Sequence, residues 1–156
     1  MSRSGIGYDI HRLAADRRLV LGGVAIEHPT GLVGHSDGDV LLHAIMDALL
    51  GAANLGDIGR HFPSDDPAYA GARSTELARR VGGLVRERGF TVRSLDATVI
   101  AEAPRLAPHV HAMRETIAKT LDIGVDLVSV KATTNDGLGA IGAAEAIAAL
   151  AIASLE

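Results

Sequence analysis

The order of apolar and polar residues predicts a strand first and then a hairpin. Residues 5–11 have a period of two, which indicates a β-strand with Asp9 and His11 on the same face. Two short apolar runs, at 18–21 and 24–27, flank a pair of glycines, and glycine permits the positive φ angles of a tight hairpin turn.

Helical spacing begins further along the chain. Apolar residues from Asp39 to Ala53 recur at the period of a helix, and Asp37 or Asp39 can cap its N-terminus. The same spacing predicts helices from about Ser74 to Arg88 and from Pro108 to about Leu121.

Later segments are strand-like, irregular or ambiguous. Residues 91–103 and 127–133 predict strands, whereas 28–36 and 56–71 are expected to be irregular, and the first of these mobile. The tail from Ala143 to Leu155 is ambiguous, because alanine favours helix while a buried strand near a subunit contact tolerates the same apolar run. Strands and helices alternate, which predicts an α/β or α+β sandwich.

Composition narrows the class of protein. The 156 residues are 47% hydrophobic but only 3% aromatic, so we expect one domain over residues 1–156 with an aliphatic core that would gain from oligomerisation. A net charge of -4 without basic clusters argues against nucleic acid and anionic membranes, and favours a small-molecule partner. No signal segment or membrane-length apolar run is visible, so we expect a cytoplasmic protein.

A candidate metal site combines the first strand and the first helix. Because the chain has no Cys, a metal must be held by His and carboxylates. Asp9 and His11 share a strand face, and His43 would add a third ligand, which leaves a fourth position open as in catalytic zinc sites. The alternative is that these three side chains bind no metal and only form hydrogen bonds with other groups of the protein. Asp47, one turn after His43, is either an acceptor for an imidazole N–H or a solvated carboxylate.

Two polar loops could bind phosphate. His35 and Ser36 precede a helix N-terminus, where N–H groups, a hydroxyl and an imidazolium suit an anion; a flexible loop with a helix cap is the alternative. Residues 131–139 open from a strand into a glycine-bearing loop that could hold phosphate and a cation such as magnesium, or could be a polar turn. His109 and His111 do not share a helix face and are interpreted as surface residues.

These segments together resemble the 2-C-methyl-D-erythritol 2,4-cyclodiphosphate synthase family over essentially the whole chain. The resemblance rests on the order and spacing of Gly5–His11, Gly22–Gly23, His35–Asp39, His43–Ala44, Asp47–Ala52, Leu55–Gly59, Phe62–Pro63, Asp66–Pro67, Ala103–Pro104, Pro108–His109 and Lys131–Thr134.

The resemblance implies a fold, an assembly and a reaction. It implies an α+β single-domain two-layer sandwich with a four-stranded mixed sheet, helices on the outer face, and sheets packed around a threefold axis in a homotrimer. The C-terminal tail would then be a strand, and active sites would lie between subunits. The implied lyase reaction converts 4-diphosphocytidyl-2-C-methyl-D-erythritol 2-phosphate to 2-C-methyl-D-erythritol 2,4-cyclodiphosphate and CMP, in the non-mevalonate pathway of isoprenoid precursors.

The resemblance also implies residue roles. Zinc would be held by Asp9, His11 and His43, and magnesium or manganese by Asp136 with the substrate diphosphate. His35 and Thr134 match the groups that stabilise the transition state. The substrate-binding positions implied by the family are Asp9, His11, His35, Ser36, Asp57, Ile58, Gly59, Phe62, Pro63, Ser64, Asp65, Asp66, Ala101, Glu102, Ala103, Pro104, Arg105, Leu106, Ala107, Thr133, Thr134, Asn135 and Asp136.

Some positions depart from the family pattern. Ala143 replaces an arginine and Ala140 replaces a bulky residue, at positions that line an axial cavity able to hold an isoprenoid diphosphate in the family. That ligand is therefore not carried over to this chain. Ser64, Arg105 and Asp136 stand for the more usual Asp, Lys and Glu.

Two other functions compete with the cyclase interpretation. A phosphohydrolase would use the same metal with water as the nucleophile. A trimeric metal-binding or interaction protein without turnover would be consistent with the altered residues at 140 and 143.

Overall fold

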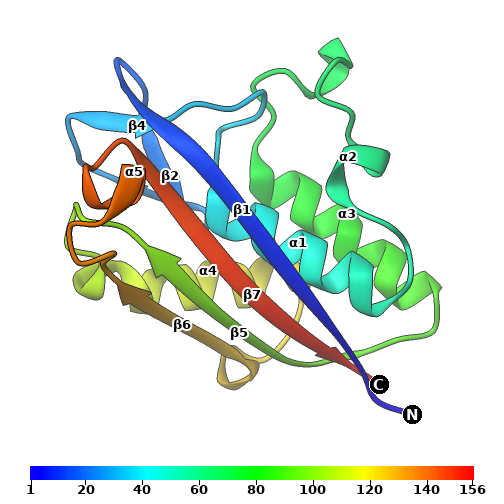
Figure 1. Ribbon diagram of the computed structural model, residues 1–156. Helices are drawn as coiled ribbons and strands as arrows, with labels where there is room; N and C mark the ends of the chain where they lie inside the picture. The colour runs from blue at the N-terminus through cyan, green and yellow to red at the C-terminus, as the bar shows by residue number, and fades with distance from the viewer.

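The computed structural model describes all 156 residues as an α+β fold around one curled sheet (Figure 1). The strands are β1 (Arg3–Ala15), β2 (Leu19–Leu21), β3 (Val24–Ile26), β4 (Thr30–Leu32), β5 (Val92–Ile100), β6 (Val128–Thr133) and β7 (Ala146–Leu155). The helices are α1 (Val40–Ala52), α2 (Ile58–His61), α3 (Ser74–Glu87), α4 (Val110–Leu121) and α5 (Gly139–Gly142), with 3-10 turns at Pro67–Tyr69, Ala107–His109 and Val125–Leu127. The periodic segments are thus confirmed as helices and strands.

The main sheet has five strands in the order β4-β1-β7-β5-β6, so the expectation of four strands is wrong. The additional strand, β4, lies inside the segment 28–36 that was predicted as a loop. It pairs with the end of β1, with Leu13 opposite Leu32. The strand has only three residues, Thr30–Leu32, which are too few to show an alternating pattern. It forms because β1 extends to Ala15 and pairs with it. β2 and β3 form the predicted hairpin as a separate pair.

The alanine-rich tail is a central strand, as the family resemblance implies. β7 is antiparallel to both β1 and β5, and β5 is parallel to β6, so the sheet is mixed. Alanines on one side of β7 are fully buried beneath α1, among them Ala149 and Ala153. Burial between two partner strands therefore overrides the helical preference of alanine.

Helix α1 lies unusually close to β1, and two glycines permit this. A Cβ atom on Gly7 would lie 1.9 Å from the carbonyl oxygen of Ala44, and one on Gly5 would lie 2.1 Å from that of Ala48. No side chain fits at either position. Asp9 and His11 follow on the same side of β1, so this contact also brings them close to α1.

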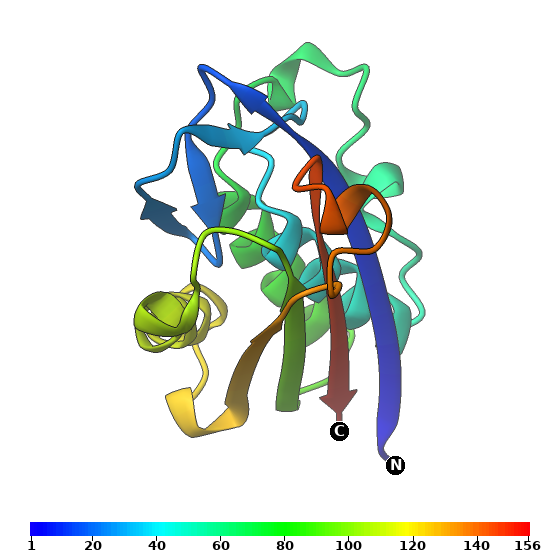
Figure 2. The same cartoon turned by 60° about the vertical axis from the view of Figure 1, so that its left-hand side comes forward.

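The other face of the sheet carries apolar side chains that the chain does not cover. Figure 2 shows β1, β7, β5 and β6 side by side, with α1 and α3 behind them. On the face away from these helices, the exposed fractions are 70% for Ile6, 53% for Tyr8, 42% for Ile10, 39% for Leu150 and 50% for Ile152. Ile6 pairs with Ile152 and Tyr8 with Leu150 across the two strands, so these five residues form one apolar patch. We call it the β1–β7 patch.

None of the helices is both long enough and apolar enough to cross a membrane.

Candidate metal centre and adjoining pockets

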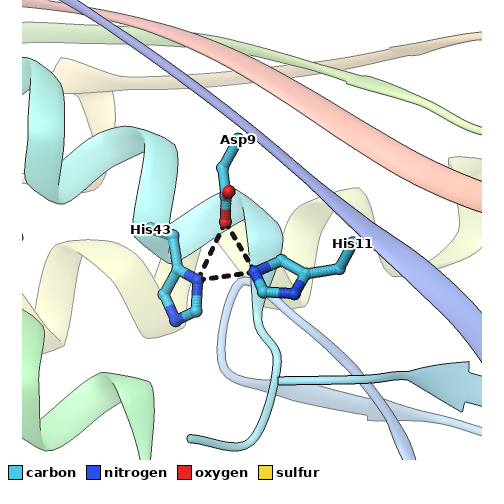
Figure 3. Close-up of side chains that lie close together, drawn as sticks. All are labelled: Asp9, His11 and His43. Atoms are coloured by element: carbon cyan, nitrogen blue, oxygen red, sulfur yellow. Dashed lines mark hydrogen bonds and ion pairs between the residues drawn. The ribbon is translucent and has the colours of Figure 1, made fainter. Parts of the chain in front are cut away.

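Three side chains from two elements converge at the candidate metal centre. Asp9 and His11 point from β1 toward α1, and His43 points back from α1 (Figure 3). Oδ2 of Asp9 lies 2.8 Å from Nε2 of His11 and 2.9 Å from Nδ1 of His43, and the two nitrogens are 3.2 Å apart. The three candidate ligand atoms lie within 4.8 Å of one another, so one ion could contact all of them. The predicted juxtaposition is confirmed.

The outer nitrogen of each imidazole is held by a protein oxygen. Nδ1 of His11 lies 2.5 Å from the carbonyl oxygen of Val33, which accepts its hydrogen. Nε2 of His43 lies 3.1 Å from the hydroxyl oxygens of both Ser36 and Ser74. These outer contacts leave the two inner nitrogens, which meet beside Asp9, as the atoms that would bind a metal. Two oriented imidazoles and one carboxylate are a donor set that fits zinc.

The charges of the three groups are coupled. Burial by itself raises the pKa of Asp9, but hydrogen bonds from His11 and His43 and their charges outweigh it and lower that pKa to about 2. The pKa of His11 is raised, chiefly by its hydrogen bond to Asp9 and against the opposing effect of burial. The carboxylate therefore stays ionised at neutral pH, and a proton competes with a metal for His11.

A cavity of about 250 Å³ opens beside the triad. Its walls come from β1, α1, α3, the segment around α2 and the loop Val33–Asp39, which we call the His35 loop. They consist of Asp9, His11, His35, Ser36, His43, Met46, Ile58, Gly59, Phe62, Ser64, Tyr69 and Leu77. The sequence interpretation included most of these residues. It missed Met46, Tyr69 and Leu77, whose apolar character marks them only as core residues.

The His35 loop is connected to the segment that follows α2. Nε2 of His35 lies 2.9 Å from the carbonyl oxygen of Asp66. The carbonyl oxygen of His35 accepts a hydrogen bond from Gly71 N–H at 2.8 Å. Asp66 caps the 3-10 turn after it, and Asp57 caps α2 through the N–H of Arg60. These two aspartates shape the cavity wall through the backbone, while Pro63 and Asp65 lie within the same segment.

A second cavity of about 300 Å³ lies at the ends of β5 and β6. It is lined by Ala101, Glu102, Pro104, Arg105, Leu106, Ala107, Ala132, Thr133 and Thr134, which include every predicted substrate-binding position from 101 to 107 except Ala103. The two cavities share no lining residue. A single chain therefore does not bring all the predicted site residues together.

The loop after β6 is held in place by Glu102. Its Oε1 accepts hydrogen bonds from the N–H groups of Asn135 at 2.9 Å and Gly137 at 3.2 Å. Asp136, between them, is exposed and is not part of the triad cluster. Ala140 in α5 and Ala143 at its end are also exposed.

Two aspartates accept from backbone N–H groups, and the helix cap predicted for Asp39 is confirmed. Asp47 does not accept from an imidazole; its Oδ1 accepts from the N–H of Ile58 at 2.8 Å. Asp39 caps α1 through Leu42 N–H at 3.0 Å, and it also accepts from both glycines of the β2–β3 hairpin. Its buried carboxylate therefore covers this helix end, which is closed to phosphate. Burial raises the pKa of Asp39 to about 6.

The structure also reveals Ser74 as a contact of His43, which the sequence interpretation missed. It marked Ser74 only as the start of a helix, because no local pattern shows that the two residues meet across 31 positions.

Comparisons with known proteins cover the whole chain. The matching family model is the YgbB family, over residues 2–156. A curated protein of Alkaliphilus oremlandii named 2-C-methyl-D-erythritol 2,4-cyclodiphosphate synthase is 56% identical over 153 residues, which are 98% of each chain.

Solved structures agree with these relatives. The bifunctional IspDF of Campylobacter jejuni superposes with a TM-score of 0.96 at 43% identity over 99% of this chain, which spans 42% of that longer protein. A 2C-methyl-D-erythritol-2,4-cyclodiphosphate synthase with bound CDP superposes with a TM-score of 0.90 at 36% identity, over 99% of this chain and 100% of that one.

Proposed function

The chain belongs to the YgbB family, and from that membership we propose that it is a 2-C-methyl-D-erythritol 2,4-cyclodiphosphate synthase of the isoprenoid precursor pathway. It would close 4-diphosphocytidyl-2-C-methyl-D-erythritol 2-phosphate into the cyclic diphosphate. An oxygen of the 2-phosphate attacks the β-phosphorus, the bond from that phosphorus to the bridging oxygen breaks, and CMP leaves with this oxygen. The observation that carries the proposal is the Asp9–His11–His43 triad beside the His35 cavity, in a chain 56% identical to a synthase of that name.

We assign zinc to the triad and magnesium or manganese to Asp136. Bound there, the cations would neutralise the phosphate oxygens and orient them for an in-line displacement. The chain's own contribution is to hold both imidazoles through Val33 and the serine hydroxyls, so that little reorganisation is needed on binding.

The two cavities divide the substrate between them. The cavity beside the triad would hold the methylerythritol phosphates, with the backbone of Asp57–Gly59 and the segment Phe62–Asp66 around the sugar. His35 and Ser36 line this cavity, where an imidazole and a hydroxyl can contact the attacking phosphate. The second cavity, formed by residues 101, 102, 104–107 and 132–134, would hold the cytidine, with Thr134 toward the diphosphate. The solved relative with bound CDP supports a cytidine nucleotide as ligand.

We propose a homotrimer of single-domain chains, each formed by residues 1–156, with the β1–β7 patches packed around the threefold axis. Exposing these adjacent apolar side chains to water is unfavourable in free energy, and a surface of this kind is typical of a protein–protein contact. The separation of the two cavities in one chain supports the same assembly, since a neighbouring subunit could place its cytidine cavity beside the triad.

Identifying the reaction products tests this function directly. We expect the purified chain with zinc and magnesium to convert the cytidylylated substrate to CMP and a cyclic diphosphate, detected by ³¹P NMR. Linear phosphates alone would identify a phosphohydrolase, and the absence of turnover would favour a metal-binding protein without catalysis.

Substitutions test the assigned metal ligands. His43→Ala and Asp136→Ala should each abolish release of CMP, because each removes a ligand to a cation that neutralises the phosphates. His111→Ala is the matched control, since this histidine is exposed and pairs only with Glu115. Near-normal rates in the first two variants would contradict the assignment.

A further inference from the structure

A buried hydroxyl connects the candidate metal ligand on α1 to a carboxylate. Ser74, the first residue of α3, has an exposed fraction of 0%, and His43 one of 7%. The Ser74 Oγ lies 3.1 Å from Nε2 of His43 and donates a hydrogen bond to Oδ1 of Asp37 at 2.5 Å. The three side chains form a continuous series behind the triad, on the side away from the candidate metal position.

The order of donors and acceptors in this series determines where the imidazole proton lies. An ionised carboxylate only accepts hydrogen bonds, so the hydroxyl proton of Ser74 is directed to Asp37. The lone pairs of Oγ then remain for the N–H at Nε2 of His43. A proton held on Nε2 leaves Nδ1, which lies 2.9 Å from Oδ2 of Asp9, as the nitrogen that would bind a metal.

Asp37 is itself held firmly. Its Oδ2 accepts from the backbone N–H of Ser74 at 2.9 Å, and its Oδ1 accepts from that of Asp39 at 3.2 Å. Its own N–H donates to the carbonyl oxygen of Ala72 at 3.0 Å. The carboxylate therefore joins the His35 loop to the start of α3, and Ser74 has little freedom to turn away.

Ser36 is the other hydroxyl near this imidazole, at the same distance of 3.1 Å from Nε2. Its Oγ accepts a weaker hydrogen bond from Gly38 N–H at 3.4 Å and has no carboxylate behind it. It also lines the cavity, whereas Ser74 does not. The two hydroxyls thus lie at the same distance from Nε2 of His43, but only that of Ser74 is held by a carboxylate. Separate substitutions can distinguish their effects.

We propose that Ser74, supported by Asp37, is a positioning residue that holds the ring and the tautomer of His43 for metal binding. The inference rests on the metal role of the triad in the proposed function and extends it to residues that contact neither metal nor substrate. Partners of this kind behind a metal-bound histidine affect metal affinity by about 10- to 100-fold when they are removed.

Zinc affinity of the full chain, measured by competition with a chromogenic chelator, tests the proposal without an activity assay. Ser74→Ala should weaken zinc binding by about 10- to 100-fold, and Ser74→Thr should restore most of the loss because it keeps the hydroxyl. Ser36→Ala should weaken binding less than Ser74→Ala. Thr120→Val removes a buried hydroxyl of α4 and should leave the affinity unchanged. Thermal unfolding of the metal-free variants checks that each one folds.

A double substitution tests whether the two residues act as one unit. Asp37→Ala alone should weaken zinc binding. The double variant Ser74→Ala/Asp37→Ala should bind zinc as tightly as Ser74→Ala alone. Unchanged affinity in Ser74→Ala, or losses that add in the double variant, would overturn the inference while leaving the proposed function intact. Failure of the unmodified chain to bind zinc would instead overturn the metal assignment and this inference together.

Discussion

At the scale of single residues, the triad shows how far local spacing determines chemistry. A period of two placed Asp9 and His11 on one face of a strand, and that placement is confirmed. His43 joins them from 32 positions beyond His11, which the family resemblance implied but spacing could not require. The groups behind the ligands, Val33 and Ser74, are brought near only by the tertiary fold.

The raised pKa of His11 predicts a pH-dependent zinc affinity. Metal binding needs the neutral imidazole, so zinc must displace a proton at any pH below the pKa of His11. Apparent affinity should therefore rise by at least about tenfold per pH unit up to that pKa, and rise less steeply above it. Asp9, with its pKa of about 2, stays ionised at these pH values and does not contribute to the pH dependence of the zinc affinity.

Zinc titrations between about pH 5 and pH 8, in the window where histidines change charge, measure this dependence. A flat profile would contradict the proton competition at His11. The variant Asp9→Asn should shift the pH-dependent range to lower pH, because the amide lacks both the strong hydrogen bond of the carboxylate and the charge that raise the pKa of His11.

At the scale of elements, packing decided what propensity left open. The periodic helices and strands were predictable because each pattern lies within one segment. The tail became strand β7 because two neighbouring strands pair with it, and β4 exists because β1 extends far enough to meet it. Gly5 and Gly7 lie in one of the blocks that resemble the family, and their physical role is to permit the close approach of α1.

Substituting Gly7 tests that close approach. In Gly7→Ala the new Cβ would lie 1.9 Å from the carbonyl oxygen of Ala44, so either the helix or the strand must move. We expect a loss of unfolding free energy at or above the upper end of the range of about 1–3 kcal/mol for overpacked cores. Because the same movement separates β1 from α1, zinc affinity should fall as well.

Gly51→Ala is the matched control for this experiment. Gly51 lies in α1 with no atom within 4 Å of its would-be Cβ, so alanine should be neutral or stabilise the helix by up to about 1 kcal/mol. Urea unfolding at one fixed protein concentration compares the variants. Equal stability of Gly7→Ala and the unmodified chain would show that the contact tolerates a methyl group.

At the scale of the whole molecule, one chain is an incomplete enzyme in this account. The triad is complete within a chain, but the cavities for the two halves of the substrate do not meet. In the proposed trimer, the β1–β7 patch would be the surface through which copies assemble. Periodicity and spacing could not reveal this division, since they place residues along a chain and not between chains; only the family resemblance implied active sites between subunits.

A charge in the β1–β7 patch should therefore separate assembly from metal binding. Ile152→Glu places a carboxylate opposite Ile6, where burial against a neighbouring subunit would be costly. We expect monomers in sedimentation velocity, loss of turnover, and zinc affinity close to that of the unmodified chain. Ala112→Glu, at an exposed position of α4, should stay trimeric and active. An active monomer of Ile152→Glu would refute the shared active site.

The identity of the oxygen that attacks phosphorus distinguishes cyclisation from hydrolysis. The reaction is run in water enriched in ¹⁸O with zinc, magnesium and the cytidylylated substrate, and the products are analysed by mass spectrometry. Intramolecular attack by the 2-phosphate predicts a cyclic diphosphate and CMP that both contain no label. One ¹⁸O atom in CMP or in a linear phosphate product would show that water is the nucleophile and would contradict the account.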